Sequence, residues 1–509
     1  MGQLVRPRYW MSLVVLTVVV TGCTGAPSDD SAGGGAVRVA IAELPPAQAD
    51  PAQHLGRPAV LIWPAFYDGL TFIDSAGDPE PWLATGWELT EPTVWTFQLK
   101  EGVEFSNGEP FDAASIVKAA DEILFGYGAE APVRLNLLPT VTDVRAVSDQ
   151  VVEIETEDPD PLLPKRVAQL YPLPPEYFDE VGSEGFAAAP IGTGPYVVDD
   201  WSPGRVTMSA NPSSWRPGQV DTLEFIEIPE SSSRRAAITS GQVEIAYDIS
   251  PTDVEDVEAG GVEVHIGTDP RIRTIAFFQR REGSPVASAD VRLALNHAVN
   301  MQQIIDTFYA GRAPIASQAA TSNATGYNDQ LSPYAYDPEL AQDLLADAGY
   351  PDGFPMSVEV VASTDLDKSL YEAVAQDLRA VGVEVELREI PFAEWREKLY
   401  SAGWESDAFS FSIAFDPTFD VSRGYQNLGC DVEHAFFCDE TVTDMVRQAD
   451  SMVDADARAA LLRDAQEVAY DNPPAIFMEE RVELIGVQGV AGFETVNLIA
   501  PWHSIAVAG

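Results

Sequence analysis

The segment from residue 191 to residue 196 restricts the path of the chain more than any other stretch. It places Gly192 and Gly194 on either side of a threonine, with Pro195 directly after them. Glycine reaches backbone conformations that are closed to other residues, while proline fixes its own φ and favours an extended conformation for the residue before it. The sequence therefore predicts a shaped turn, from which the chain leaves in an extended conformation.

A β-hairpin is expected directly after this turn. Residues 196–198 predict one strand, residues 199–204 a turn and residues 206–210 a second strand. Taken alone, a Gly-x-Gly-Pro run is a weak signal, and an ordinary hairpin with a glycine-rich approach is the simplest interpretation. Its functional meaning therefore depends on the rest of the chain.

The chain is long and strongly acidic. Its 509 residues predict about three domains, at roughly 150 residues per domain. Acidic residues outnumber basic ones by 80 to 30, which gives a net charge of −50. This balance argues against nucleic-acid binding, because such binding depends on neutralising phosphates with lysine and arginine. A solvated surface adapted to salt or solubility is the favoured interpretation, and attraction of cationic ligands is the alternative.

Residues 1–22 are predicted to be an export signal. Arg6 and Arg8 form a charged start, and the apolar run 11–20 follows them. A run of this length is too short to span a membrane comfortably, so a cleaved signal peptide is the better interpretation. The chain is therefore expected to be extracytoplasmic.

A lipid anchor is predicted directly after this signal. Residues 20–23 resemble a bacterial lipobox, which implies cleavage before Cys23 and lipid on its thiol and amine. A plain signal peptide or an uncleaved anchor is the alternative. Residues 23–35 are small and polar and are expected to form a lipidated, flexible tether. The protein would then be lipid-anchored at the outer face of the cell membrane.

Several stretches, in order along nearly the whole chain after the tether, resemble one protein family. The matches lie at 50–70, 81–111, 192–215, 234–246, 274–300 and 336–353. The most specific resembles the family pattern P.LA.SWE…WTF.LR.GV.F.DG.P, and the segment 192–215 resembles GTGPY…W…G…N…W. Together they resemble the family 5 extracellular solute-binding proteins, which serve ABC importers for oligopeptides, dipeptides, nickel chelates and some sugars.

The resemblance implies an α/β, two-lobed, periplasmic-binding-protein-like (type II) fold with an inserted extra subdomain and a hinge. The alternation of helix and strand patterns after residue 336 also argues for an α/β lobe. Local patterns predict strands over 37–41 and 475–478, a strand face shared by residues 95, 97 and 99, helix starts at Asp112 and Asp337, and a last long helix over 455–470. In family terms, lobe I comprises 36–75, 188–270 and 484–509, its inserted subdomain comprises 76–187, and lobe II comprises 271–483. The ligand would lie in the cleft between the lobes and be trapped by hinge closure.

Asp416 is expected to bind an amine of the ligand. The peptide binders of the family carry a Trp-x-x-Asp motif whose aspartate holds the peptide's amino terminus. Residues 404–407 fit these letters, but the last of them better matches an earlier position of the family pattern. The register chosen gives the amine role to Asp416 and puts Ile413 in place of the tryptophan, which weakens the case for a peptide. A carboxylate at a strand end beside Phe415 would meet a cation with little competing water, and an ordinary turn aspartate is the alternative.

Further ligand contacts are expected from Phe415 itself and from three other places. Leu55, Gly56 and Arg57 fall where the family lays its backbone beside the ligand, with an ordinary surface loop as the alternative. Trp395 falls where the peptide binders place a pocket tryptophan, although a buried structural role is nearly as well supported. Tyr425 could supply a polar contact, and there a surface loop is favoured.

Cys430 and Cys438 are expected to form a disulfide. The dipeptide binders of the family carry a similar local bridge, and an exported chain meets an oxidising environment. The histidines are scattered and no Cys-x-x-Cys pair occurs, so a zinc site is not indicated and no cofactor is expected.

These patterns predict a substrate-binding lipoprotein of an ABC importer. It would capture a small solute, most often a short peptide in this family, and deliver it to a permease and ATPase complex as a monomer. A lipid anchor would raise its concentration near the permease. A binder of a sugar or metal chelate, or a lipoprotein sensor without transport, is the alternative. An enzyme is not expected, because the sequence carries no Gly-x-Ser-x-Gly, His-Glu-x-x-His or phosphate-loop motif.

Overall fold

The computed structural model describes the chain from residue 34 to residue 508, apart from seven short gaps. The described residues are 34–46, 48–53, 56–128, 131–362, 364–399, 403–415, 417–430 and 435–508. The predictions made for the export signal 1–22, for the lipidated Cys23, for Leu55 and for Asp416 lie outside them. In the described part of the chain, no helix is both long and apolar enough to cross a membrane.

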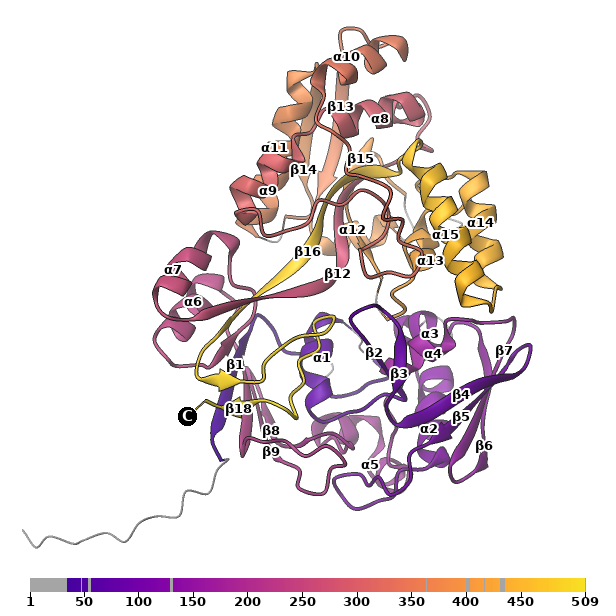
Figure 1. Cartoon of the computed structure of the whole chain (residues 1–509), viewed down its shortest axis with the longest axis vertical. Helices are drawn as coiled ribbons and strands as arrows, with labels where there is room; N and C mark the ends of the chain where they lie inside the picture. Colours follow the sequence, from indigo (N-terminus) through magenta and orange to yellow (C-terminus); the bar gives the residue numbers. More distant parts are fainter. Residues whose placement is uncertain are drawn as a thin grey trace, which may run out of the picture. The chain divides into compact units, whose positions relative to one another are not determined.

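A mixed β-sheet of ten strands runs through the described residues (Figure 1). From edge to edge its order is β14-β13-β15-β12-β16-β11-β1-β10-β9-β8. The strands are β1 (Ala36–Ile41), β8 (Tyr196–Ser202), β9 (Arg205–Ala210), β10 (Thr222–Glu227), β11 (Ile245–Ala246), β12 (Glu263–Phe277), β13 (Phe354–Val360), β14 (Val383–Glu389), β15 (Ala408–Ala414) and β16 (Ala475–Val487). The strand predicted over 37–41 is confirmed as β1, in which Val37 and Val39 are fully buried.

The two longest strands, β12 and β16, pair with each other in the middle of this sheet. On its other side β12 pairs with β15, and β16 pairs with β11, so both halves of the sheet are attached to them. The register between β12 and β16 shifts between Thr268 and Ile272, around Pro270. Such an irregularity bends a strand and increases its twist. The lobe boundaries expected at 270/271 and 483/484 fall within these strands, so continuous β-structure crosses both.

A separate antiparallel sheet lies within 76–187, the part expected to be an inserted subdomain. Its order is β4 (Ala84–Glu91), β5 (Val94–Leu99), β7 (Val151–Thr156) and β6 (Val141–Ser148). Trp95, Phe97 and Leu99 of β5 are buried, as their shared strand face predicts. Two short pairs complete the described strands, namely β2 (Thr71–Ile73) with β3 (Pro79–Pro81) and β17 (Val490–Ala491) with β18 (Ala506–Val507).

The helices lie between these strands along the chain. The described α-helices are α1 (Arg57–Ile62), α2 (Ala113–Asp121), α3 (Pro132–Leu137), α4 (Leu163–Arg166), α5 (Pro175–Ala188), α6 (Ser231–Thr239), α7 (Val254–Ala259), α8 (Ala289–His297), α9 (Met301–Tyr309), α10 (Pro338–Asp347), α11 (Asp365–Ala380), α12 (Phe392–Glu397), α13 (Val421–Gly424), α14 (Glu440–Asp450) and α15 (Ala455–Tyr470). Short 3₁₀ turns include η3 (Val167–Gln169).

Several predicted helix ends are confirmed. The Asp112 side chain accepts hydrogen bonds from the first turn of α2, and Asp337 does the same for α10. Carboxylates are favoured at this position because they satisfy backbone N–H groups that have no partner within the helix. The last long helix, α15, has the predicted bounds 455–470.

Buried hydrophobic residues form separate cores on the two sides of β12 and β16. One large core is drawn from residues 37–225 together with parts of 245–247 and 485–505. Two further cores are built entirely from residues 272–478. The cores therefore separate close to the residues at which the lobe boundaries are expected.

The glycine-rich segment 191–196 packs directly against the backbone of Phe66. Gly194 donates its N–H to the Phe66 carbonyl at 3.0 Å, and a Cβ built on Gly192 would lie 1.8 Å from that same oxygen. Neither glycine has a left-handed φ, so the close approach of the two backbones explains the glycine at position 192.

Beside this contact, one buried carboxylate collects several donors, and we refer to the group as the Asp68 cluster. Asp68 accepts hydrogen bonds from Trp82 Nε1 at 2.7 Å, Thr193 Oγ1 at 2.7 Å and Trp215 Nε1 at 3.1 Å. Arg216 forms a salt bridge with it at 2.5 Å. The cluster thereby links Thr193 of the glycine-rich segment to Trp82, which lies just before β4, and to residues 215–216, which follow β9.

The hairpin that follows is longer than predicted. Residues 199–202 were expected in a turn, but β8 continues through them to Ser202. The pairing of β8 with β9 has a register irregularity between Val198 and Asp200. The turn itself is confined to Pro203 and Gly204. Gly204 has φ 79°, a left-handed conformation that suits a tight hairpin turn.

Trp502 closes the core around β1. Its side chain is fully buried, its Nε1 donates to the Leu61 carbonyl at 3.1 Å, and its ring meets Phe225 edge-on with centroids 5.1 Å apart. The Tyr196 hydroxyl donates to the backbone carbonyl of Trp502. Residues distant in sequence thus complete one core.

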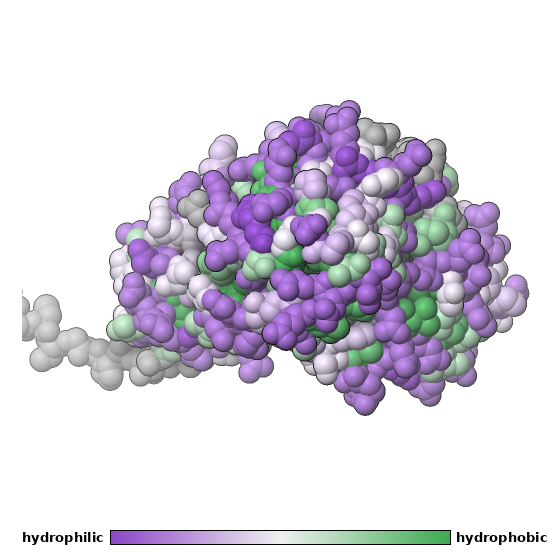
Figure 2. All heavy atoms as spheres, turned by 90° about the horizontal axis from the view of Figure 1, so that it is seen from above, coloured by the Kyte–Doolittle hydropathy of each residue, from purple (hydrophilic) through white to green (hydrophobic). Residues whose placement is uncertain are grey.

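The structure contains the predicted disulfide between Cys430 and Cys438. The surface seen in Figure 2 is dominated by hydrophilic residues, with hydrophobic ones in smaller areas between them.

Candidate functional site

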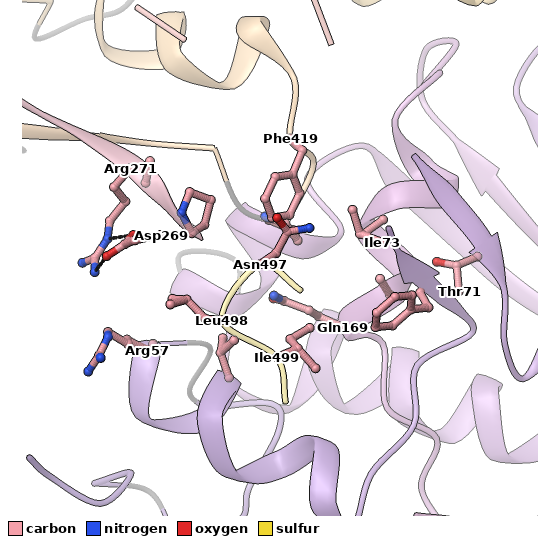
Figure 3. A pocket seen from close by; sticks show the side chains of 17 residues that line it. Arg57, Thr71, Ile73, Gln169, Asp269, Arg271, Phe419, Asn497, Leu498 and Ile499 are labelled. Carbon is pink, nitrogen blue, oxygen red and sulfur yellow. Dashed lines mark hydrogen bonds and ion pairs between the residues drawn. The ribbon is translucent and has the colours of Figure 1, made fainter. Parts of the chain in front are cut away.

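A cavity of about 260 Å³ lies where β12 bends. It is lined by residues from the start of α1, from β2, from η3, from the irregular part of β12, from the segment after β15 and from residues 497–499 (Figure 3). These segments come from both sides of the expected lobe boundaries. A concave, mainly apolar space with a few polar groups is the usual form of a small-molecule site.

Two of the predicted contact residues line this cavity. Gly56 and Arg57 contribute to its wall, as the expectation for this stretch requires. Ala414 and Pro417 line it as well. They stand on either side of Asp416 in the sequence, although Asp416 itself lies outside the described residues. Phe415 is fully buried and donates its backbone N–H to the Pro270 carbonyl at 2.9 Å.

Trp395 and Tyr425 are not among the described residues that line the cavity. The Trp395 ring stacks on Phe411, and its Nε1 donates to the Ser410 carbonyl at 2.8 Å. Tyr425 is 4% exposed and lies 3.1 Å from the side chain of Gln466, to which its hydroxyl donates. Both side chains therefore have structural partners away from this space.

Three residues of the cavity wall have an unusual backbone conformation. Phe419, Asn497 and Leu498 have φ values of 46°, 51° and 70°. Such values are uncommon for residues other than glycine, and they persist where surrounding contacts hold the backbone in place. Asn497 supplies two such contacts, since it accepts from Asn323 at 2.8 Å and donates to the Asp74 carbonyl at 2.8 Å.

Side chains also join the two sides of the expected lobe boundary near the cavity. Lys165, which is 7% exposed, donates to Thr325 Oγ1 at 2.7 Å. Arg423 donates to the Asn136 side chain at 2.6 Å. Burial lowers the pKa of Lys165, in spite of acidic groups nearby. These bonds, with that between Asn323 and Asn497, connect residues of the expected lobe II to residues outside it.

Arg57 is paired with two carboxylates. Its guanidinium forms a salt bridge with Asp248 at 3.0 Å and a closer one with Glu483. Burial acts to lower the pKa of Arg57, but the charges of Glu483 and Asp248 outweigh it and hold that pKa above its usual value. Burial raises the pKa of Glu483, and Arg57 opposes the shift. Arg57 is therefore a cation under all ordinary conditions.

A second ion pair lies at the bend of β12. Arg271 Nε donates to Asp269 Oδ1 at 2.6 Å, and the dashed lines of Figure 3 mark this pairing. Burial acts to raise the pKa of Asp269, but the charge of Arg271 outweighs it and the pKa lies below its usual value. Asp269 is thus an anion at neutral pH.

Most of the cavity wall was not predicted from the sequence. Phe72, Gln169, Phe419 and the stretch 497–499 carry no local motif, and they meet only through the fold. Pro270 is a partial exception. A proline between charged residues inside a strand pattern is a signal for an irregular strand.

A mixed sheet in which two long strands join separate cores, with a small cavity beside the irregular part of β12, is the arrangement expected of a two-lobed solute receptor. Residues 78–431 match the family model described as "Bacterial extracellular solute-binding proteins, family 5 Middle". The chain belongs to this family, which confirms the family predicted from its motifs.

Individual relatives agree with this assignment. The chain is 24% identical to the glutathione-binding protein GsiB of Shigella flexneri serotype 5b (strain 8401), over 81% of this chain and 82% of that protein. It is 27% identical to the nickel-binding periplasmic protein of Escherichia coli (strain K12), over 63% of this chain and 65% of that protein.

A solved structure extends the likeness to the fold. The periplasmic binding protein DppA of Helicobacter pylori, in complex with peptide STSA, superposes with a TM-score of 0.77 at 20% identity, covering 94% of this chain and 99% of that one. The predicted α/β, two-lobed, periplasmic-binding-protein-like fold is therefore confirmed.

Proposed function

We propose that this solute-binding protein is the lipid-anchored receptor of an ABC importer and that it captures a short peptide or another primary-amine solute. The observation that carries the proposal is the cavity between β12, α1 and the segment after β15, which Gly56, Arg57, Ala414 and Pro417 all line. We further propose lobe I as 36–75, 188–270 and 484–509 with 76–187 inserted, and lobe II as 271–483.

Asp416 is the proposed partner of the ligand's amine, because its neighbours Ala414 and Pro417 line the cavity. The relatives that are named for glutathione and crystallised with a peptide support a peptide ligand. Phe415 would act by fixing this segment, since it is fully buried. Trp395 and Tyr425 would act only indirectly, through the segments that they support.

A non-peptide solute, such as a metal chelate, is the second candidate. Ile413 occupies the position in which the family's peptide binders place a tryptophan, and it is 3% exposed. A relative named for nickel is among the similar proteins. A sensor that presents its ligand without transport is a third reading, and permease and ATPase genes beside this gene would argue against it.

Asp416→Ala is expected to weaken binding of a free-amine peptide at least about tenfold. A hydrogen bond to a charged group contributes about 1.5–3 kcal/mol, and about 1.4 kcal/mol corresponds to one decade of affinity. Titration calorimetry with a peptide library and N-acetylated counterparts measures the effect. Asp444→Ala is the matched control, because its side chain is 73% exposed on α14. Equal affinity for free and acetylated peptides would remove the amine role.

Cys23→Ala is expected to release the protein from membranes into the medium or periplasm. The expectation rests on the lipobox-like residues 20–23, since a lipid on Cys23 would be the attachment. Membrane fractionation followed by immunoblotting is the measurement, and Ser31→Ala in the tether is the control. A Cys23→Ala variant that stays in the membrane fraction like the wild type would contradict the anchor.

A further inference from the structure

The cations of the cavity are already neutralised by carboxylates of the chain. Among the described residues, the basic side chains that line the cavity are Arg57 and Arg271. Arg57 lies between Asp248 and Glu483, and Arg271 is paired with Asp269. An anionic ligand would therefore meet guanidinium groups whose positive charge is already neutralised by neighbouring carboxylates.

Among the described residues, the ion pairs at this wall join equal numbers of arginines and acids. Arg481 also approaches Asp269, with Nε 3.8 Å from Oδ2. Three arginines then face three acids: Arg57, Arg271 and Arg481 against Asp248, Asp269 and Glu483. A ligand carboxylate placed here would add a negative charge without a counterion, in a site where Glu483 is 5% and Asp269 3% exposed. Burying such a charge is costly.

Exchange of partners does not remove this cost. A ligand carboxylate could bind Arg57 only by displacing Glu483 or Asp248, and the displaced group would lose its partner. Glu483 is additionally fixed by the backbone N–H of Asp248, which donates to its Oε1 at 2.7 Å. The net charge of −50 also repels anions as they approach.

The cavity still offers a neutral polar side chain and space for a ligand. Gln169 lines the cavity, and its side-chain amide can both donate to and accept from a ligand carboxamide. The volume of about 260 Å³ lies below the roughly 300–1,000 Å³ of pockets that hold drug-sized ligands, so the ligand is compact.

We infer that the cavity selects against ligands with a carboxylate, and that its ligand is a compact amine whose other end is an amide or is uncharged. The Arg57–Asp248–Glu483 group is the selecting element. This inference rests on the proposed function, because it names the class of solute that the same cavity takes. It sets the chain apart from a receptor that reads both charged ends of a peptide.

Calorimetry at pH 8 with four probes tests the inference: alanyl-leucine, alanyl-leucinamide and the N-acetylated form of each. For the wild-type protein, the amide is expected to bind at least about tenfold more tightly than the acid. In Glu483→Gln, Arg57 faces a single carboxylate, so the ratio of amide to acid affinity is expected to fall towards one. Glu244→Gln is the matched control. Like Glu483→Gln, it removes a carboxylate that is paired with an arginine, here Arg38. Neither Glu244 nor Arg38 lines the cavity, so the ratio of amide to acid affinity should not change.

Asp248→Asn gives a second route to the same change if Glu483→Gln does not fold. Asp248 has φ 54°, a conformation that asparagine adopts readily, so this variant keeps the backbone and removes one charge. Its ratio of amide to acid affinity should also fall. An acid that binds the wild type as tightly as the amide overturns the inference, and so does a ratio that neither variant changes.

The acetylated probes separate this inference from the proposed function. Loss of binding on acetylation without preference for the amide overturns the inference and leaves the amine role standing. Preference for the amide without an effect of acetylation does the reverse. Failure of all four probes to bind overturns both.

Discussion

Replacing Asp68 by alanine is expected to lower the free energy of unfolding by about 3–5 kcal/mol, because it leaves a buried cation without its partner. Arg216, whose side chain is 8% exposed, would keep its charge in the core. The donors from Trp82, Thr193 and Trp215 would lose their acceptor at the same time. Each unsatisfied buried donor adds a further cost of about 1–3 kcal/mol when no water replaces the acceptor.

Urea unfolding followed by tryptophan fluorescence measures this loss. A two-lobed chain can unfold in more than one step, so the loss should fall on the transition that involves the core around β1. Asp256→Ala is the control, since that side chain is 80% exposed and should change stability by no more than about 0.5 kcal/mol. A change of less than about 1 kcal/mol in Asp68→Ala would show that the Asp68 cluster does not support the core.

Gly192→Ala is expected to cost about 3 kcal/mol or to prevent folding, because the new Cβ would lie 1.8 Å from the Phe66 carbonyl oxygen. Neither backbone can move away easily. Gly192 accepts a hydrogen bond from Ser106 at 2.9 Å, and Phe66 accepts one from Gly194 at 3.0 Å. A shift that relieved the clash would break bonds on both sides of the contact.

Thermal unfolding and soluble yield measure the effect against Gly86→Ala. A Cβ at Gly86 has no neighbour within 4 Å, and its backbone is not left-handed, so this variant should be neutral or slightly stabilising. If the two variants melt at the same temperature, the close packing of segment 191–196 on Phe66 is not rigid.

Local elements were predictable from the sequence where one physical signal dominated. The cap at Asp112 and the bounds of α15 follow from side-chain capping and from an unbroken apolar repeat. Strand β16 shows the opposite. Only its beginning, 475–478, was expected as a strand, whereas it continues to Val487.

The acidic residues of β16 beyond Met478 obscured the pattern. Glu479 is fully buried because Arg273 and Tyr309 donate to it at 2.6 and 2.9 Å. Partners that are so distant in sequence cannot be recognised from the residues that surround Glu479 in the chain. A carboxylate that would end a strand on hydropathy alone can therefore lie inside one.

The candidate site was less predictable for a related reason. Its wall brings together segments as distant as Gly56 and Leu498, and no periodicity links them. Family resemblance located one part of the wall at Gly56 and Arg57. The same resemblance also placed Trp395 and Tyr425 at the site. In the structure Tyr425 belongs to a core and the half-buried Trp395 packs against it, a use that aromatic residues serve equally well.

The position of Trp502 has a consequence for the order in which the chain assembles. This side chain fills the core beside Phe225 and bonds to Leu61, 441 positions earlier. The two cores built from residues 272–478 need no residue from elsewhere in the chain, so they can form before the C-terminal residues are available. The core around β1 is complete only when Trp502 has joined it, and contacts between residues so far apart in sequence form slowly. We therefore expect the core around β1, which joins the beginning of the chain to its end, to be completed after the cores built from residues 272–478.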